Sequence, residues 1–226
     1  HAYHEITEKA VQSFRHKFGS YEFVCGNISN YEGAKFLQGL GVDGVKVGSG
    51  SGHGCQTRPA TGTGAPQIHA VRSAWHALRE SGIPVISDGG VEMPGDIAKA
   101  LAVGASSVMM GGFFAGTEET PGRVIRQAGK PLYKVYRGMT SPEAKMESLD
   151  DEAEIGNVEG EAKEVPYAGR VKAVLSQIKD NLQSMVSYVG KLTLQEAIAE
   201  ISANPLGYLI PLTEASQRES FKNRPK

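Results

Sequence analysis

Four short apolar runs alternate with helix-like stretches along the first two-thirds of the chain, and this alternation constrains the fold most strongly. The runs cover residues 22–28, 44–48, 84–88 and 107–111, and each contains a glycine or a proline. They show no steady alternation of apolar and polar residues, unlike strands that have one wet face. Such strands are typical of a parallel sheet that is covered by helices on both faces.

The stretches between these runs carry helix signals. Between residues 66 and 79, apolar residues recur at helical spacing and would share one face: Ile68, Val71, Trp75 and Leu78. Pro94 is suited to the first turn of the next helix and Gly104 to its end. Thr193 and Glu196 form a capping box, which predicts the start of a later helix.

Strand–helix units repeated in this way predict an α/β fold, and four of them amount to half of a (β/α)8 TIM barrel. We therefore expect residues 1–226 to be the C-terminal half of a single barrel domain, holding strands 5–8. The chain does not begin with methionine, which also fits an excised or incomplete piece. A half barrel has two open sheet edges, and its inward-facing region would be partly wet: Val45, Val47, Val85, Ile86, Val108 and Met110. Expressed alone, such a piece is expected to aggregate and to lack activity.

The character of the chain changes between residues 140 and 164. This stretch is rich in glutamate and aspartate and contains no aromatic residue. A segment of that composition has little apolar surface to bury. We expect it to be a mobile flap on the barrel domain, followed by an amphipathic helix at residues 171–189.

Composition excludes several classes of function. The formal net charge is −1, which gives no electrostatic footprint for nucleic acid or for an anionic membrane surface. No apolar run is long enough to span a bilayer, and the first residues do not resemble a signal peptide. The two cysteines, Cys25 and Cys55, form no disulfide framework, and free thiols favour a cytoplasmic protein.

Cys55 lies in the segment with the strongest chemical signal. Residues 47–58 (VGSGSGHGCQTR) leave a predicted strand and pass through a loop with four glycines ahead of the cysteine. In a parallel barrel this loop lies at the carboxyl end of the sheet, where active sites are built. Backbone dipoles around an exposed thiol favour the reactive thiolate. The same residues also fit a tight structural turn around an incidental buried thiol, so the loop alone leaves both interpretations open.

Two later strands end in paired glycines. Residues 87–90 (SDGG) and 109–112 (MMGG) fall in the next two strand–helix loops, where barrels commonly bind phosphate through backbone amides. Asp88 could accept hydrogen bonds from ribose hydroxyls, or it could cap the following helix. Beside a loop cysteine, the two glycine pairs predict a site for a nucleotide phosphate.

Taken in order, these motifs resemble those of the IMP dehydrogenase and GMP reductase family. The resemblance rests on residues 47–67, on SDGG and MMGG, on residues 136–139 (YRGM) and on residues 159–169 (EGEAKEVPYAG). It extends from residue 1 to about residue 190. It implies that a cysteine attacks C2 of a purine nucleotide and that hydride passes between C2 and a nicotinamide. Covalent catalysis would divide one difficult exchange into two easier steps.

The resemblance also implies roles for individual residues. Cys55 would be the nucleophile, and Thr57 and Glu159 would manage the proton on departing ammonia. The substrate-binding positions would be Asn27 near the reaction centre, Asp88 at the ribose, Gly90, Gly111, Gly112 and Tyr136 at the 5′-phosphate, and Gly138 and Met139 at the base edge. The carbonyls of Gly50, Gly52 and Cys55 correspond to a loop that binds a monovalent cation such as K⁺ in many members. Cys25, inside a predicted strand, is expected to be a small core residue.

The Cys55 loop departs from the family pattern at two positions. His53 stands where the family usually has a serine that contacts phosphate, and a histidine could still donate a hydrogen bond there. Gly54 replaces a customary aliphatic residue. The first four strands of the family barrel, with part of its nicotinamide site, have no counterpart in these residues.

The flap bears on which of the two family activities is expected. IMP dehydrogenases hydrolyse their covalent intermediate with an arginine and a tyrosine on a long flap, and residues 140–158 contain neither. The short flap and residues 57–67 (TRPATGTGAPQ) are similar to GMP reductases. The resemblance therefore favours NADPH-dependent conversion of GMP to IMP and ammonia. Residues 217–220 (QRES) resemble the cation-binding tail of bacterial dehydrogenases, so NAD-dependent oxidation of IMP to XMP remains an alternative.

A non-catalytic homologue that binds nucleotide, or that serves as a partner subunit, is a third possibility. His53 suits such a protein, whereas Cys55, Thr57 and Glu159 together argue against it. For the full-length protein, the resemblance further implies a cytoplasmic homotetramer whose small-molecule partner is a purine nucleotide, GMP or IMP.

Overall fold

A computed structural model describes residues 1–138, residue 141 and residues 160–210. The helices are α1 (Glu5–Phe18), α2 (Tyr31–Gly39), α3 (Thr57–Thr61), α4 (Gln67–Leu78), α5 (Pro94–Ala102), α6 (Gly112–Ala115), α8 (Val171–Tyr188), α9 (Leu194–Ala203) and α10 (Pro205–Tyr208). The strands are β1 (Val24–Ile28), β2 (Gly44–Val47), β3 (Val85–Asp88), β4 (Ser107–Met109), β5 (Tyr133–Arg137) and β6 (Ala162–Pro166).

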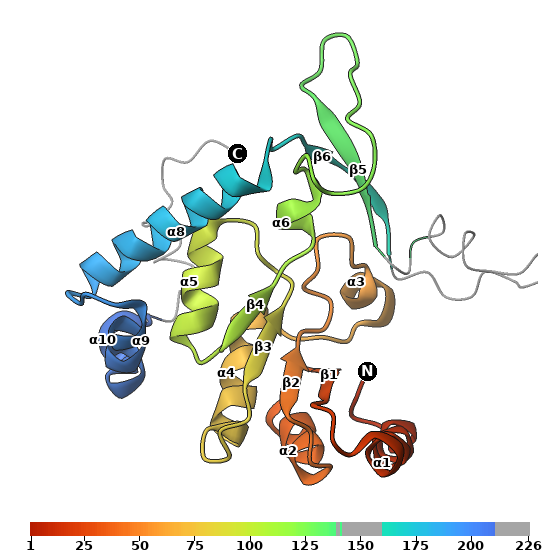
Figure 1. Ribbon diagram of the computed structural model, residues 1–226, viewed down its shortest axis with the longest axis vertical. Helices are drawn as coiled ribbons and strands as arrows, with labels where there is room; N and C mark the ends of the chain where they lie inside the picture. The colour runs from red at the N-terminus through yellow and green to blue at the C-terminus, as the bar shows by residue number, and fades with distance from the viewer. Residues whose placement is uncertain (139–140, 142–159, 211–226) are drawn as a thin grey trace, which may run out of the picture.

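The four predicted apolar runs form one parallel sheet in the order β1-β2-β3-β4. Each strand pairs in parallel with the next one in the sequence, through helices that pack beside them (Figure 1). The prediction of an α/β fold with a parallel sheet is therefore confirmed. Within the described residues the sheet is open, with β1 and β4 at its edges, so the half-barrel assignment stays a prediction.

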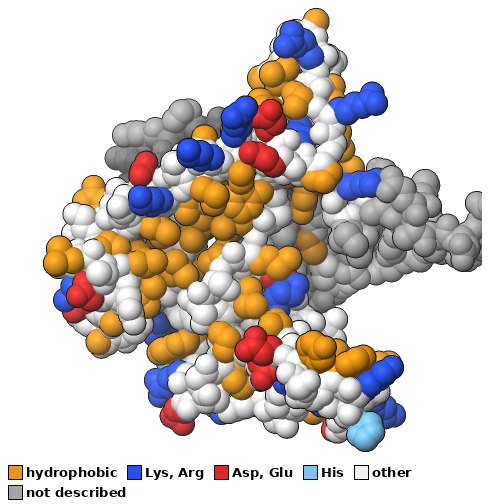
Figure 2. All heavy atoms as spheres, viewed as in Figure 1, with side chains coloured by type: hydrophobic (Ala, Val, Ile, Leu, Met, Phe, Trp, Pro, Cys, Tyr) orange, Lys and Arg blue, Asp and Glu red, His pale blue; other side chains and the backbone are white. Residues whose placement is uncertain are grey.

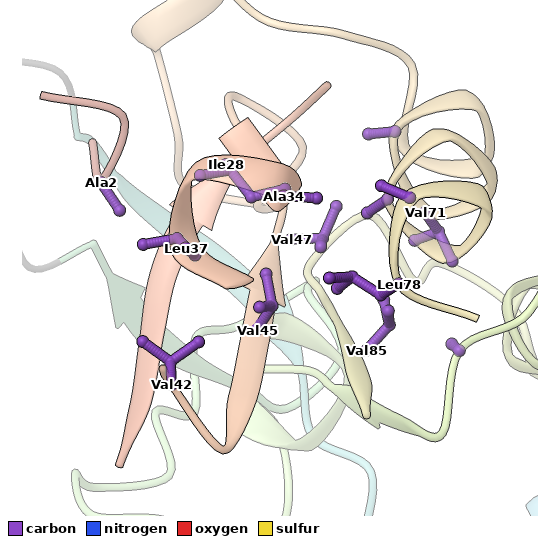
Figure 3. Packing of buried hydrophobic residues seen from close by; sticks show 14 of the residues in the cluster. Ala2, Ile28, Ala34, Leu37, Val42, Val45, Val47, Val71, Leu78 and Val85 are labelled. Atoms are coloured by element: carbon purple, nitrogen blue, oxygen red, sulfur yellow. The ribbon is translucent and has the colours of Figure 1, made fainter. Parts of the chain in front are cut away.

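The main core lies between this sheet and the helices α2 and α4. Figure 3 shows Val45 and Val47 of β2 and Val85 of β3 directed at side chains of these helices, such as Leu37 and Val71. All of them are at most 1% exposed. Burying a side chain of this size contributes about 1.5–3 kcal/mol, so this layer supplies much of the folding free energy.

Of the six residues expected to be partly wet, Ile86, Val108 and Met110 are indeed only partly buried, but the expectation is wrong for Val45, Val47 and Val85. In a strand, successive side chains point to opposite faces, and these valines all take the helix-covered face. The opposite face of β2 and β3 carries Lys46, Ile86 and Asp88, which are only partly buried. Edge positions are more open, since Val24 of β1 and Met109 of β4 are each 50% exposed.

Strands β5 and β6 form a separate antiparallel ladder that runs from Tyr133 paired with Pro166 to Arg137 paired with Ala162. Lys134 anchors the ladder, because its buried Nζ donates hydrogen bonds to the carbonyls of Thr117 and Thr120 after α6. In Figure 1 the ladder lies beyond the same end of the sheet as α3 and α6. The expected flap at 140–164 lies mostly outside the described residues, although residues 162–164 belong to β6.

The C-terminal helices pack on the outer side of the β4 end of the sheet. Helix α8 lies against α5, with Val174 and Ile178 buried beside Ile97. Helix α9 begins with the predicted capping box: Glu196 N donates to Thr193 Oγ1 at 3.2 Å, and Thr193 N donates to Glu196 Oε2 at 3.0 Å. In Figure 2, hydrophobic side chains are also visible on the surface over this part of the molecule. Among the described helices, none combines the length and apolar character needed to cross a membrane.

An ion pair fixes α1 to the loop ahead of β2, and it should make stability depend on pH. Arg15 Nη2 lies 2.5 Å from Asp43 Oδ2, and Phe23 N donates to the same oxygen at 2.7 Å. The Arg15 guanidinium first, and then the Phe23 N–H, hold the pKa of Asp43 below its ordinary value. A lowered folded-state pKa stabilises the protein above the unfolded pKa of about 3.9, and this contribution disappears as the pH falls through the folded pKa.

Asp43→Asn is therefore expected to lower the free energy of unfolding at pH 7 but to have a smaller effect in acid. Urea unfolding of both proteins between about pH 7 and pH 3 measures the difference. Asp180→Asn, at an exposed aspartate of α8, is the matched control and should show no such trend. A loss of the same size at every pH would contradict the assigned ion pair.

Candidate functional site

The carboxyl ends of β1, β2 and β3 bring three polar groups together. Asn27 Nδ2 donates hydrogen bonds of 2.9 Å to the Gly48 carbonyl and to Asp88 Oδ2. Lys46 Nζ lies 2.8 Å from the same oxygen of Asp88. The sequence singled out Asn27 and Asp88, and the structure places them in direct contact. The sequence did not point to Lys46, because a single lysine within the apolar run 44–48 gives no local signal of function.

The loop between β2 and α3 is held in place by polar side chains from its surroundings. Ser51 Oγ donates to the Asp88 carbonyl at 3.0 Å, and Gln67 Nε2 donates to the Val47 carbonyl at 2.8 Å and to Ser87 Oγ at 3.0 Å. Arg58 Nε donates to the Ser49 carbonyl at 3.2 Å. The loop is thus built from contacts that reach across to β3 and α4, which a purely local turn does not require.

Cys55 ends this loop, next to the start of α3. Its Sγ donates to Thr57 Oγ1 at 3.1 Å, so the predicted nucleophile contacts one of the two residues predicted to manage the proton. Gly52 accepts a hydrogen bond of 3.0 Å from Cys55 N, and Cys55 forms an isolated antiparallel bridge with Gly160. The thiol is only partly buried, which leaves it accessible to a ligand at the carboxyl end of the sheet.

Cys25 has a different environment. It lies in the middle of β1 and packs against the main core. Burial raises the pKa of its thiol. A raised pKa disfavours the thiolate that acts as nucleophile, in agreement with the prediction that Cys25 is a core residue.

The predicted phosphate positions converge around the start of α6. A Cβ built on Gly112 would lie 2.7 Å from His53 Cβ, and one built on Gly111 would lie 2.8 Å from Tyr136 Oη. The rings of His53 and Tyr136 have centroids 6.1 Å apart. A hollow of about 440 Å³ adjoins His53, with Glu92, Gly112 and Phe113 also in its lining. A larger residue at Gly111 or Gly112 would press on these side chains, and the role of both glycines at a phosphate stays a prediction.

The Cys55 loop also contacts the β5–β6 ladder. Glu161 N donates to the Gly54 carbonyl at 3.1 Å, and Gly138 N donates to the Glu161 carbonyl at 3.2 Å. A hydrogen bond from Lys163 is the main cause that holds the pKa of Glu161 below its ordinary value. Gly54 lies close to Tyr136, with 3.2 Å between its built Cβ and Tyr136 Cε1, so a larger residue here would press on the ring.

The remaining predicted positions have mixed outcomes. Gly90 lies at the end of β3 with φ +76°, beside Ser51 of the Cys55 loop. Gly50 has φ +73° and packs on Arg58, and the Gly52 carbonyl already accepts the Cys55 N–H. Carbonyl oxygens are ligands that hard cations prefer, and the cation site at Gly50, Gly52 and Cys55 stays a prediction. Met139 and Glu159 lie outside the described residues.

Known proteins resemble this chain over most of its length. The family model described as "IMP dehydrogenase / GMP reductase domain" matches residues 1–222. Inosine-5′-monophosphate dehydrogenase from Nitrosopumilus maritimus is 42% identical over 205 residues, which are 87% of this chain and 43% of that protein. The dehydrogenase from Escherichia coli K12 is 40% identical over 203 residues, covering 87% of this chain and 41% of its own length.

A similar solved structure is that of GMP reductase from Trypanosoma brucei in complex with guanosine 5′-monophosphate. It superposes with a TM-score of 0.85 at 32% sequence identity and covers 97% of this chain and 45% of that chain. The chain therefore spans less than half the length of the relatives that it matches. The family match over almost the whole sequence shows that this chain belongs to the IMP dehydrogenase / GMP reductase family.

Proposed function

We propose that the protein is a GMP reductase, which converts GMP, NADPH and a proton to IMP, ammonia and NADP⁺. The contact between Cys55 Sγ and Thr57 Oγ1, 3.1 Å at the carboxyl end of the sheet, carries the covalent mechanism. The choice of reductase rests on the segment 140–158, which contains neither the arginine nor the tyrosine of the dehydrogenase flap. Without that pair, water activation has no evident catalyst.

In the proposed reaction, the Cys55 thiolate forms a bond to C2 of GMP and the bond from C2 to the exocyclic nitrogen breaks. Thr57 and Glu159 direct a proton to that nitrogen, so that it leaves as ammonia. When bound, the nicotinamide supplies the hydride that C2 receives. The S–C2 bond then breaks, returning the electron pair to Cys55 and releasing IMP. Partial exposure of Cys55 supports this order of steps, because a hydride donor can reach C2 of a purine that is bonded to Sγ.

The polar groups around the sheet ends support the assignment of the nucleotide site. Asp88, held by Asn27, is proposed to accept hydrogen bonds from the ribose hydroxyls. The 5′-phosphate is assigned to Gly90, Gly111, Gly112, Tyr136 and His53, and the base edge to Gly138 and Met139. Close approach of His53 to Gly112 supports histidine in the place of the usual serine. The carbonyls of Gly50, Gly52 and Cys55 would hold a potassium ion.

We also propose that the four-stranded sheet is one half of a (β/α)8 barrel, supplying strands 5–8. Sequential parallel strand order and the half-exposed edge residues Val24 and Met109 support this proposal. The relatives, which are more than twice as long, have room for the other four strands. We further propose that the full-length protein is a cytoplasmic homotetramer and that residues at about 140–164 form a flap on its barrel domain.

IMP dehydrogenase is the second candidate, because the curated relatives at about 40% identity carry that name. It would share Cys55 and the nucleotide site but would require hydrolysis of the covalent intermediate. The two candidates therefore differ in the fate of one intermediate.

Steady-state assays on protein from the complete coding sequence separate the candidates. GMP with NADPH is expected to yield IMP and ammonia in equal amounts. The loss of NADPH fluorescence monitors the reaction, and chromatography identifies the nucleotide product. IMP with NAD is expected to give no turnover to XMP. Steady formation of XMP without reduction of GMP would remove the reductase assignment and leave the dehydrogenase.

A further inference from the structure

Lys46 reaches the site from the middle of β2. Its neighbours Val45 and Val47 are fully buried under the helices, so its own side chain projects from the opposite face of the sheet. There Nζ lies 2.8 Å from Asp88 Oδ2 and 3.9 Å from Met109 Sδ. The ammonium thus contacts side chains of β3 and β4 at the carboxyl end of the sheet.

Gly26 of β1 provides the room that Lys46 needs. A Cβ built on Gly26 would lie 2.4 Å from the Lys46 carbonyl and 2.7 Å from Lys46 Cβ. Any other residue at position 26 would collide with both the backbone and the side chain of Lys46. The close packing of β1 against β2 therefore fixes the position of Lys46 Cβ, from which the side chain extends to Asp88 on β3.

The contacts on Asp88 are unequally divided between its two oxygens. Lys46 Nζ and Asn27 Nδ2 both approach Oδ2, at 2.8 and 2.9 Å. Among the described residues, none forms a hydrogen bond to Oδ1. An ionised carboxylate can accept about four hydrogen bonds, so Oδ1 retains its full capacity to accept. The carboxylate is oriented by the protein through one oxygen and offers the other.

We infer that Lys46 is a positioning residue, which acts through Asp88 to present Oδ1 to the hydroxyls of a bound ribose. This inference rests on the proposed function, since it assumes a nucleotide at the Asp88 site. Side chains on rigid strands, fixed by a second layer of contacts, hold a ligand-binding group in one geometry.

A structural role is the competing explanation, because an ion pair between β2 and β3 could merely hold the sheet together. The two roles differ in which ligand is affected. If Lys46 acts through the ribose contact, its loss weakens binding only of nucleotides with ribose hydroxyls. If it holds the sheet together, binding of every nucleotide weakens alike.

The test measures calorimetric dissociation constants of GMP and of 2′,3′-dideoxy-GMP with protein from the complete coding sequence. Lys46→Met, which removes the charge and keeps the chain length, is expected to weaken GMP binding about tenfold or more, the usual effect of losing a charged hydrogen bond. Binding of the dideoxy analogue should change by less than about twofold. Lys46→Arg should keep most of the preference for GMP over the dideoxy analogue, because arginine is also a cationic donor.

Lys99→Met is the matched control. It removes a lysine that lies 2.8 Å from Asp96, at the surface of α5, and it should leave both dissociation constants unchanged. Thermal melts report folding of each variant, and Lys46→Gln, which keeps a donor, replaces Lys46→Met if the latter melts too low. Equal weakening of both nucleotides, or no weakening of either, would overturn the role of Lys46.

Failure of the proposed function gives a different result. If the unmodified protein binds GMP but does not reduce it with NADPH, the reductase assignment fails while the binding comparison still decides the role of Lys46. If it binds the dideoxy analogue as tightly as GMP, the ribose contact of Asp88 is absent, and the inference about Lys46 falls with it.

Discussion

Cys55→Ala is expected to lower kcat for reduction of GMP by about 10⁴-fold or more, the usual cost of removing a covalent nucleophile. Alanine has no sulfur to bond to C2, so the route through the covalent intermediate is lost. Binding of GMP should remain within about fivefold, because ribose and phosphate contacts do not involve Sγ. Single-turnover assays and calorimetry measure the two quantities separately.

Cys25→Ala is the internal control for this prediction. Cys25 lies in β1 against the main core, and burial raises the pKa of its thiol. The substitution should leave kcat unchanged and cost about 1 kcal/mol in stability, as a modest core truncation. GMP should also protect Cys55, and not Cys25, from an alkylating reagent. Loss of chemistry in Cys25→Ala with normal turnover in Cys55→Ala would reverse the assignment, and labelling that ignores GMP would favour a non-catalytic homologue.

The parallel sheet could be predicted from sequence because its signals are local. Each of β1 to β4 is a short apolar run near a glycine or a proline, and helix signals follow the runs at residues 44–48 and 84–88. Asn27 and Asp88 were assigned to the site by their resemblance to family positions, and the structure places them in contact. The capping box at Thr193 was found for a similar reason, as it involves residues three apart.

Other features depend on contacts between distant residues, which no local pattern encodes. A run such as GVKVG indicates a strand without showing which face the helices cover, and so the valines were assigned to the wrong side. The same ambiguity concealed Lys46, whose partner lies 42 positions away on β3. Pairing of β5 with β6 likewise joins residues on both sides of the segment 139–159.

The resemblance to the family assigned roles that local patterns alone could not. It paired Thr57 with Glu159 in proton transfer beside the nucleophile Cys55, and the structure shows Cys55 Sγ in contact with Thr57 Oγ1 at 3.1 Å, whereas Glu159 lies outside the described residues. It also identified His53 as a departure, and in the structure this side chain lies against Gly112 and near the ring of Tyr136. The roles of these residues in catalysis and binding remain predictions.

Gly48→Ala is expected to cost about 2–5 kcal/mol of stability and to weaken nucleotide binding as well. Gly48 joins β2 to the Cys55 loop with φ +150°, a conformation that residues with a Cβ rarely adopt. An added Cβ would lie 2.3 Å from the Asp88 carbonyl oxygen and 3.0 Å from Gln67 Oε1. Backbone strain of about 1–2 kcal/mol adds to overpacking of about 1–3 kcal/mol. Because the collision is with backbone, a change of side-chain rotamer cannot relieve it.

Gly62→Ala separates backbone strain from collision. Gly62 follows α3 with φ +68°, and a Cβ built there meets nothing within 4 Å. It should therefore cost only the strain, about 1–2 kcal/mol, and leave GMP binding intact. In Gly48→Ala, relief of the contact requires the Cys55 loop and Asp88 to move apart, which breaks the hydrogen bond from Ser51 Oγ to the Asp88 carbonyl. Urea unfolding and GMP calorimetry on both variants test this account. If the two substitutions lower stability and affinity equally, the close approach at Gly48 does not hold the loop against Asp88.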